Sequence, residues 1–281
     1  MVGITNKVLL AEIRRQQQLS QSIVEGQTAI STGKTLNKPS DDALAWVQVS
    51  ELGRAQAQQA AWQSNVSTSL TRSTTADDSL DEMKNLLTQA QELMTSARNG
   101  ALNDTSRAAI VEQMKTIRTT IDSLLNQTDF NGVPTFDDGQ SILTPVGRGL
   151  NLAVVGTKQD VSEGIDVNGT PTTLDAILAQ SIAALESGND ADLSTGLDAI
   201  KAGQNHIILE QTKQGVRGNR LEEIGTRLTT LDIDIKERRD NLEATNLQEV
   251  ISSTAAKLLQ LDAAQASYAR INQQTLFDLI K

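Results

Sequence analysis

The sequence predicts a mainly α protein: a long antiparallel coiled-coil rod built from the N- and C-terminal helices, with a small β-containing middle segment. Apolar residues recur at alternating three- and four-residue spacing along proline-poor stretches on both sides of the middle. This spacing is typical of helices that bury one narrow seam against a partner helix. Three of the four prolines and a group of glycines fall between residues 134 and 171, which indicates turns and short strands there.

The inner helices are defined by three apolar series. The series are Leu80, Met83, Leu87, Ala90, Met94 and Ala97; then Ile110, Met114, Ile117, Ile121 and Leu124; and finally Leu221, Ile224, Leu228, Leu231 and Ile235. From residue 217 to residue 281 there is no proline. An unbroken helix over that stretch would reach about 100 Å at ~1.5 Å per residue, far longer than helices of ordinary globular domains. The length therefore favours a rod over a globule.

The terminal helices carry weaker seams. The first helix has a seam that reads Glu12, Gln16, Leu19, Ile23, Gly26 and Ile30, and the last has one that reads Leu247, Ile251, Thr254, Leu258, Leu261, Gln265 and Tyr268. A helix that is only partly amphipathic buries little surface alone. We therefore expect the terminal helices to need partner chains that supply the missing face.

Local signals place the first helix boundaries. The first helix, about residues 4–32, is predicted to end at Gly33 as its C′ residue. A loop over residues 37–42 follows, in which Ser40 or Asp41 is predicted to cap the next helix. That second helix is predicted to run towards Asn99 with a break near residues 76–78, and residues 103–106 are predicted to cap the third helix.

Composition excludes several classes of function. The chain has 25 Lys and Arg against 35 Asp and Glu, a formal net charge of -10, which argues against partners that are nucleic acids or anionic membranes. It has no cysteine and a single histidine, His206, so disulfides, thiolate chemistry and multi-histidine metal sites are excluded. The first twelve residues lack the features of a cleaved signal peptide. We expect a cytoplasmic protein or one that is exported without such cleavage.

Motifs for catalysis and cofactors are incomplete. His206 has no G-x-S-x-G nucleophile elbow to complete a triad, so we interpret it as an ordinary helical or surface residue. Residues 147–149 begin like a dinucleotide loop, but the glycines that should follow are missing. In residues 164–169, glycine replaces the first acidic ligand of a calcium loop, and Asn168-Gly169 instead predicts a hairpin turn. We expect no enzyme, no cofactor and no metal site.

Three segments resemble the flagellin superfamily. Residues 29–43 carry a Ser-Thr-Gly-Lys stretch, a short polar link with Pro39, and then Asp41 and Asp42 followed by alanine, which is similar to the N-terminal signature of that superfamily. Residues 128–133 resemble the point where flagellins leave their helical domain for the β-containing one. Residues 269–279 resemble the branch found at the junction of hook and filament. Two features depart from the pattern: Leu44 and Trp46 stand among the small residues after the two aspartates, and the Asn-rich start of many filament flagellins is missing.

The resemblance implies a structural, self-assembling subunit of the bacterial flagellum, with the hook-filament junction protein as the first interpretation and filament flagellin as the alternative. It implies terminal helices that pair and line the inner tube of the assembly, and export by the flagellar type III apparatus to the extracellular flagellum without a cleaved signal peptide. The implied partners are copies of the chain, other flagellar axial proteins (a hook-associated protein or flagellin) and an export chaperone. The residues expected to pack between subunits are Leu19, Ile23, Ile30, Ile251, Leu258, Leu261, Ile271 and Leu276. Those expected to shape the first loop are Gly33, Pro39, Asp41 and Asp42, although capping and core packing alone would explain each of these residues equally well.

The expected organisation has five segments. They are a terminal assembly helix with its loop (1–40), the N-terminal half of the rod (41–132), a turn-rich, solvent-facing α/β middle segment (133–205), the C-terminal half of the rod (206–245) and a C-terminal assembly helix (246–281). Two other functions stay open. Flagellin-like proteins can be surface receptors for carbohydrate, although the few aromatic residues are not clustered as sugar sites usually require. An unrelated coiled-coil scaffold or chaperone would explain the seams but not the motif around residues 33–42.

Overall fold

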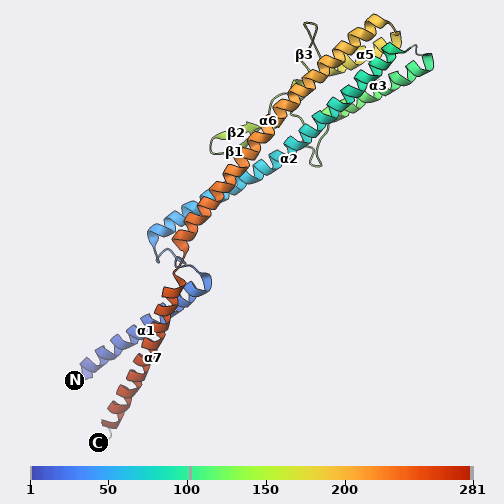
Figure 1. The fold of residues 1–281 in the computed structure, drawn as a ribbon. Helices are drawn as coiled ribbons and strands as arrows, with labels where there is room; N and C mark the ends of the chain where they lie inside the picture. The colour runs from blue at the N-terminus through green and yellow to red at the C-terminus, as the bar shows by residue number, and fades with distance from the viewer. Residues whose placement is uncertain (1, 101–102, 279–281) are drawn as a thin grey trace. The chain divides into compact units, whose positions relative to one another are not determined.

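The structure, a computed structural model, describes residues 2–100 and 103–278, with side chains described for residues 10–100 and 103–270. The chain divides into two compact units, each considered by itself. Unit 1 holds Met1–Ala57 and Ile233–Lys281, and unit 2 holds Gln58–Asp232. The helices labelled in Figure 1 are α1 (Val2–Thr32), α2 (Ala43–Asn99), α3 (Asp104–Leu125), α5 (Leu174–Ser187), α6 (Asp190–Glu243) and α7 (Leu247–Asp278). A short α4 (Lys158–Ser162) lies in the middle segment. The predicted mainly α class is confirmed.

Helices α2 and α6 pair antiparallel in unit 2. Three hydrogen bonds cross between them, at positions that rise along α2 as they fall along α6: Gln59 to Leu228, Ser73 to Gln214, and Thr88 to Gln204. The buried side chains of α2 recur every three or four residues from Val66 to Ala97. The seam is therefore continuous, as the sequence predicts for a coiled-coil pair.

The predicted break in α2 near residues 76–78 is wrong. Ala76 is fully buried within the seam, between the buried residues Ser73 and Leu80. Because the seam passes through this point without a gap, Asp77 and Asp78 occupy the outer side of an uninterrupted helix. Packing against α6 thus overrides the weak helix propensity of two adjacent aspartates.

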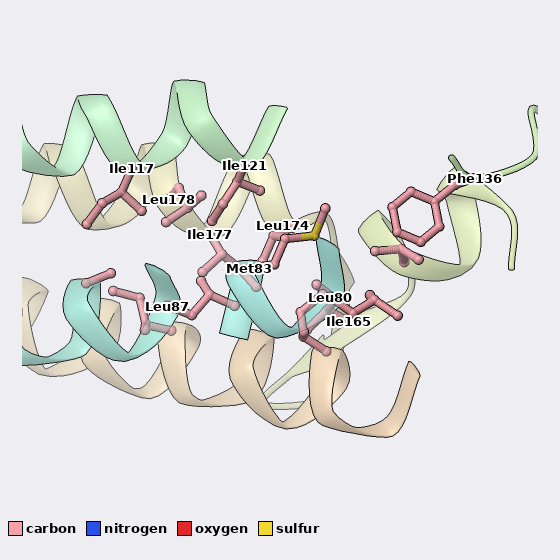
Figure 2. Packing of buried hydrophobic residues seen from close by; sticks show 14 of the residues in the cluster. Leu80, Met83, Leu87, Ile117, Ile121, Phe136, Ile165, Leu174, Ile177 and Leu178 are labelled. Atoms are coloured by element: carbon pink, nitrogen blue, oxygen red, sulfur yellow. The ribbon is translucent and has the colours of Figure 1, made fainter. Parts of the chain in front are cut away.

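The core of unit 2 gathers side chains from four helices. In Figure 2, Leu80, Met83 and Leu87 of α2 lie close to Leu174, Ile177 and Leu178 of α5, and Ile117 and Ile121 of α3 face the same cluster. The apolar series predicted in α2 is buried throughout, and the series in α3 is buried from Met114 to Ile121. In α6, Leu221 and Leu228 are buried as predicted, whereas Leu231 is 42% exposed.

The middle segment forms two separate β-hairpins. Strands β1 (Leu143–Gly147) and β2 (Leu150–Ala153) pair antiparallel with a bulge between Pro145 and Gly147. Strands β3 (Ile165–Val167) and β4 (Thr170–Thr172) also pair antiparallel. The residues between them, Asn168 and Gly169, both have positive φ (56° and 82°), as a two-residue hairpin of the type predicted from Asn-Gly requires.

The predicted cap of the third helix is confirmed, whereas two other boundaries differ from the prediction. Asn103 caps α3 through its side chain. At the start of α2 the capping residue is Asp42, which accepts hydrogen bonds from Leu44 N and Ala45 N at 2.9 Å each, so the prediction of Ser40 or Asp41 is wrong. The stretch after residue 217 is not one helix either, because α6 ends at Glu243 and α7 begins at Leu247.

A buried ion pair attaches the middle segment to α2. Asp137 is fully buried, and its carboxylate accepts hydrogen bonds from Arg72 Nη2 and from Ile142 N, both at 2.6 Å. The same guanidinium group donates two further hydrogen bonds to Pro134 O, at 2.8 and 3.0 Å. Because Asp137 is fully buried and Arg72 largely so, each depends on the other for its opposite charge.

Replacement of Asp137 by alanine should therefore destabilise unit 2 strongly. The change leaves the Arg72 guanidinium buried without its counter-charge, and we expect the free energy of unfolding to fall by about 3–5 kcal/mol. Urea denaturation followed by the fluorescence of Trp62, which lies in unit 2, measures this. A Trp46→Phe background removes the other tryptophan.

The matched control is Asp175→Ala. Asp175 forms hydrogen bonds of 2.6 and 2.8 Å with Arg118, but both side chains are exposed, so the loss should be at most about 1 kcal/mol. Equal losses for the two variants would contradict the anchoring role of Asp137.

Candidate assembly interface

Helices α1 and α7 of unit 1 pair antiparallel. A backbone bridge joins Lys34 to Ala244 just beyond the ends of the two helices, and Gly26 of α1 lies against Thr254 of α7 further along the pair. A Cβ atom added at Gly26 would lie 2.2 Å from Thr254 Oγ1. The two helices are therefore at close approach where small side chains meet.

The face that α1 turns to α7 matches the predicted seam. Its members are all buried or half-buried: Glu12, Gln16, Leu19, Ile23, Gly26 and Ile30. In α7 the inner face differs from the predicted seam and consists of Val250, Thr254, Lys257, Leu261, Ala264 and Tyr268. Ile251 and Leu258 lie outside it, with 51% and 42% of their surface exposed. Thr254, Leu261 and Tyr268 belong to both faces, and Thr254 is the residue that lies against Gly26.

The terminal helix pair buries little apolar surface. Of the described side chains in α1 and α7, only Ile23, Ala29 and Thr254 are buried. Gln16 Nε2 is buried without a hydrogen-bond partner among the described residues, which costs free energy. The contrast with the continuous buried seam of α2 is large, and it indicates that the pair is held weakly by its own packing.

Large apolar side chains remain exposed on both terminal helices. These side chains are Leu10, Ile13 and Val24 of α1 and Leu247, Ile251, Leu258 and Leu259 of α7. Leu247, Ile251 and Leu258 share one helical face, since they are spaced four and seven residues apart. Exposed apolar surface of this kind marks sites of protein association.

Of the remaining residues predicted to pack between subunits, the structure places some and leaves others undescribed. Leu19 and Ile30 are half-buried on the inner face of α1, Ile23 is buried there, and Leu261 is half-buried on the inner face of α7. Ile271 and Leu276 lie in α7 outside the residues whose side chains are described.

The loop between α1 and α2 contains the residues that we expect to shape it. Gly33 has a φ of 69° and its N–H bonds to Ala29 O at 2.9 Å, which ends α1. Pro39 stands second in a turn closed by Asp41 N and Lys38 O at 3.0 Å. The Asp41 carboxylate accepts hydrogen bonds from Asn37 N and Lys38 N, which lower the pKa of this group.

In unit 1 the turn after α1 contacts the turn between α6 and α7. We call this contact the clasp. It is formed by Gly33, Lys34 and Thr35 on one side and by Arg239 and residues 243–245 on the other. Thr35 N donates to Glu243 O at 2.9 Å, and Thr245 N donates to Gly33 O at 3.3 Å. The Glu243 side chain, only 6% exposed, forms ion pairs with Lys34 and with Arg239. The clasp thus ties the end of α1 to the start of α7.

The turn from α6 into α7 lies at the boundary expected between segments 206–245 and 246–281, and a local signal marks it. Asn246 Oδ1 accepts a hydrogen bond from Glu249 N at 3.3 Å. An asparagine followed three residues later by glutamate is typical of a helix start, so the Asn-Leu-Gln-Glu sequence could have indicated a new helix at Leu247.

The described residues contain no group of acidic and histidine side chains able to hold a metal ion. His206, in α6, is half-buried, and its Nε2 lies 2.8 Å from Asp160 O. No helix in the part of the chain that the structure describes is long and apolar enough to cross a membrane. A groove of about 750 Å³ lies beside the clasp, lined by residues of α1, α7 and the loop, among them Glu25, Lys38 and Lys257.

Comparison with known proteins finds one matching family. Residues 4–141 match the bacterial flagellin N-terminal helical region. The flagellar hook-associated protein 3 of Escherichia coli (strain K12) is 25% identical over 289 residues, which covers 90% of this chain and 91% of that protein. A flagellin from Halalkalibacterium halodurans is 24% identical over 94% of both chains.

Solved structures share the fold. One described as a putative flagellar hook-associated protein from Vibrio parahaemolyticus superposes with a TM-score of 0.66 at 20% identity, covering 73% of this chain and all of that one. The flagellar hook associated protein-3 of Legionella pneumophila gives a TM-score of 0.62 at 12% identity, over 69% of this chain and 98% of that one.

The close contact in the terminal pair predicts the effect of Gly26→Ala. The new methyl group must displace Thr254, which costs about 1–3 kcal/mol for an overpacked site. We therefore expect α1 and α7 to separate more often, which faster trypsin cleavage after Lys257 would report. Gly53→Ala is the control, because an added Cβ there meets nothing within 4 Å and alanine favours the helix by about 0.5–1 kcal/mol. Faster cleavage of the control, or unchanged cleavage of Gly26→Ala, would contradict the contact.

Proposed function

Because the chain belongs to the flagellin superfamily, we propose that it is a structural subunit of the bacterial flagellum that stands at the junction of hook and filament. Two curated relatives named hook-associated protein 3 support this placement, and each is covered over nine tenths or more of its length. The proposal assigns the chain no catalytic role.

The terminal helix pair is the observation that carries the proposal. Among its described side chains, it exposes seven large apolar ones while burying little of its own surface. A pair of this kind gains stability when neighbouring subunits cover the exposed face, since apolar burial contributes roughly 25 cal/mol per Å². Assembly through α1 and α7 therefore buries the apolar side chains that the single chain leaves exposed.

We choose the residues proposed for contacts between subunits by the exposure of their side chains. Ile251 and Leu258 lie on the outer side of α7, where a neighbour can reach them. Leu19, Ile23, Ile30 and Leu261 face the partner helix of the same chain, so we propose that they act in assembly by keeping the pair together.

The partners, location and segment roles that we propose follow from the resemblance to the flagellin superfamily. Neighbours along the flagellar axis would be a hook-associated protein or flagellin, and a chaperone would hold the chain before export. The proposed location is the extracellular flagellum, reached without cleavage of a signal peptide. The segments 1–40 and 246–281 are proposed as the assembly regions, segments 41–132 and 206–245 as the rod, and segment 133–205 as the part that faces solvent.

Filament flagellin is the second candidate, favoured by the flagellin of Halalkalibacterium halodurans that matches 94% of this chain. The two candidates differ in what the pure protein does. A filament subunit elongates by itself, whereas a junction subunit stays monomeric or forms short rings. A carbohydrate receptor finds less support, because the exposed aromatics Phe130 and Trp46 belong to different units.

Electron microscopy of the purified chain under polymerising conditions tests the proposal. We expect monomers or short rings, and addition of a preformed hook or filament end should recruit the chain. A double variant, Ile251→Asp with Leu258→Asp, should abolish recruitment but leave helix content unchanged, because both side chains are exposed in the isolated chain.

The control variant is Val216→Asp, which places the same charge on a 63% exposed apolar position of unit 2 and should leave recruitment intact. Long filaments formed by the pure chain would show that it is a filament flagellin. Recruitment that survives the double variant would show that the outer face of α7 is not the contact.

A further inference from the structure

We propose that Asn99 is a site of self-driven chemical modification, at which the side-chain amide is lost and a carboxyl group takes its place. The reaction needs water but no other protein, and it does not depend on the function proposed above. It follows from the way in which α2 ends at Asn99 and the chain continues with Gly100.

The chemistry requires an asparagine that is followed by a residue with an accessible backbone nitrogen. The nitrogen of Gly100 attacks Cγ of Asn99, the new N–Cγ bond closes a succinimide ring, and the Cγ–Nδ2 bond breaks. The proton from the attacking nitrogen ends on the departing nitrogen, which leaves as ammonia. Water then opens the ring at either carbonyl carbon and yields aspartate or isoaspartate. Glycine favours the attack because it has no Cβ atom to crowd the approach.

The sequence contains this pair of residues three times, with the asparagine at Asn99, Asn131 and Asn168. All three asparagines are exposed, so access to water does not distinguish them. They differ in whether the peptide after the asparagine can rotate to bring its nitrogen against Cγ. A nitrogen that donates a hydrogen bond must give up that bond first, and this raises the barrier to the attack.

The peptide after Asn131 is held in a turn. Gly132 N donates to Asp129 O at 3.0 Å. The Asp129 carboxylate in turn accepts hydrogen bonds from Asn131 N and Val133 N, both at 2.8 Å. Rotation of this peptide would break the bond of Gly132 and disturb the turn around Asp129.

The peptide after Asn168 is held more firmly. Gly169 N donates to the Asp166 carboxylate at 2.6 Å, and a hydrogen bond to a charged acceptor is stronger than one to a neutral acceptor. Strands β3 and β4 fix both ends of this turn. We therefore expect Asn168 to be the best protected of the three.

The peptide after Asn99 has no such restraint. A helix leaves the carbonyl groups of its last turn without an intrahelical donor. Among the described residues, no backbone hydrogen bond is donated by Gly100 N or accepted by Asn99 O, so this peptide can rotate without losing one. The Asn99 side chain also lines a groove of about 430 Å³ together with polar residues of α2 such as Glu92 and Ser96. Water can therefore reach the ring once it has formed.

The product changes the end of α2. Conversion places a negative charge at the C-terminus of the helix, where the carbonyl groups already carry partial negative charge, and this is unfavourable. Isoaspartate in addition inserts one extra carbon atom into the backbone. We expect the modification to loosen the last turn of α2, next to Arg98.

Peptide mapping by mass spectrometry tests the proposal. The full-length chain is incubated at neutral and at mildly alkaline pH, and samples are digested at acidic pH to prevent conversion during the digest. We expect Asn99 to convert at least about tenfold faster than Asn131 or Asn168, which corresponds to about 1.4 kcal/mol in the barrier. Isoaspartate in the product identifies the ring intermediate. The rate should rise with pH, because base removes the proton of the attacking nitrogen.

The controls separate the effect of the fold from that of the sequence. In urea the three asparagines should convert at similar rates, since the hydrogen bonds of the folded chain are gone. Gly100→Ala should slow the conversion of Asn99 alone, and Asp166→Ala, which frees Gly169 N, should accelerate the conversion of Asn168 alone. Equal rates at the three sites of the folded protein, conversion of Asn99 only in urea, or an unchanged rate in either variant would overturn the proposal.

Discussion

The continuous burial of apolar side chains along α2 is the constraint on which the folded structure of unit 2 depends. A buried residue recurs every three or four positions from Val66 to Ala97, so α6 must follow α2 along this whole length for the seam to leave water. Helices α3 and α5 extend the same core, and the hairpins attach to its side through the buried pair of Arg72 and Asp137. Because this unit satisfies its own seam, it needs no other chain to fold.

Unit 1, in contrast, does not bury a continuous apolar seam between its terminal helices. Its helices α1 and α7 meet at close approach where Gly26 lies against Thr254, and several large apolar residues of α7, among them Ile251 and Leu258, are exposed. The free energy that would come from burying them is therefore available only to an assembly. The clasp joins the loop after α1 to the end of α6 through the ion pairs of Glu243 with Lys34 and Arg239.

The sequence predicts the fold class, the inner seams and the Asn168-Gly169 turn because each rests on a local period or on turn chemistry. The continuity of α2 through Asp77 was missed, since it depends on what packs against the helix. The shift of the α7 face is of the same kind. Thr254, Leu261 and Tyr268 belong to both the predicted and the observed face, and only the folded pair shows that Val250, Lys257 and Ala264 complete it. No local pattern could identify Glu243 as the partner of Lys34, because residues so far apart meet only through the fold.

The central claim is that the terminal pair is weakly held in the single chain and is completed by assembly. Amide hydrogen exchange of the isolated and the assembled protein measures this most directly, because protection reports local opening free energies. The account predicts fast exchange throughout α1 and α7 in the isolated chain, slow exchange in α2 between residues 66 and 97, and strong protection of α1 and α7 after assembly. Exchange in α1 and α7 as slow as in α2 before assembly would contradict it.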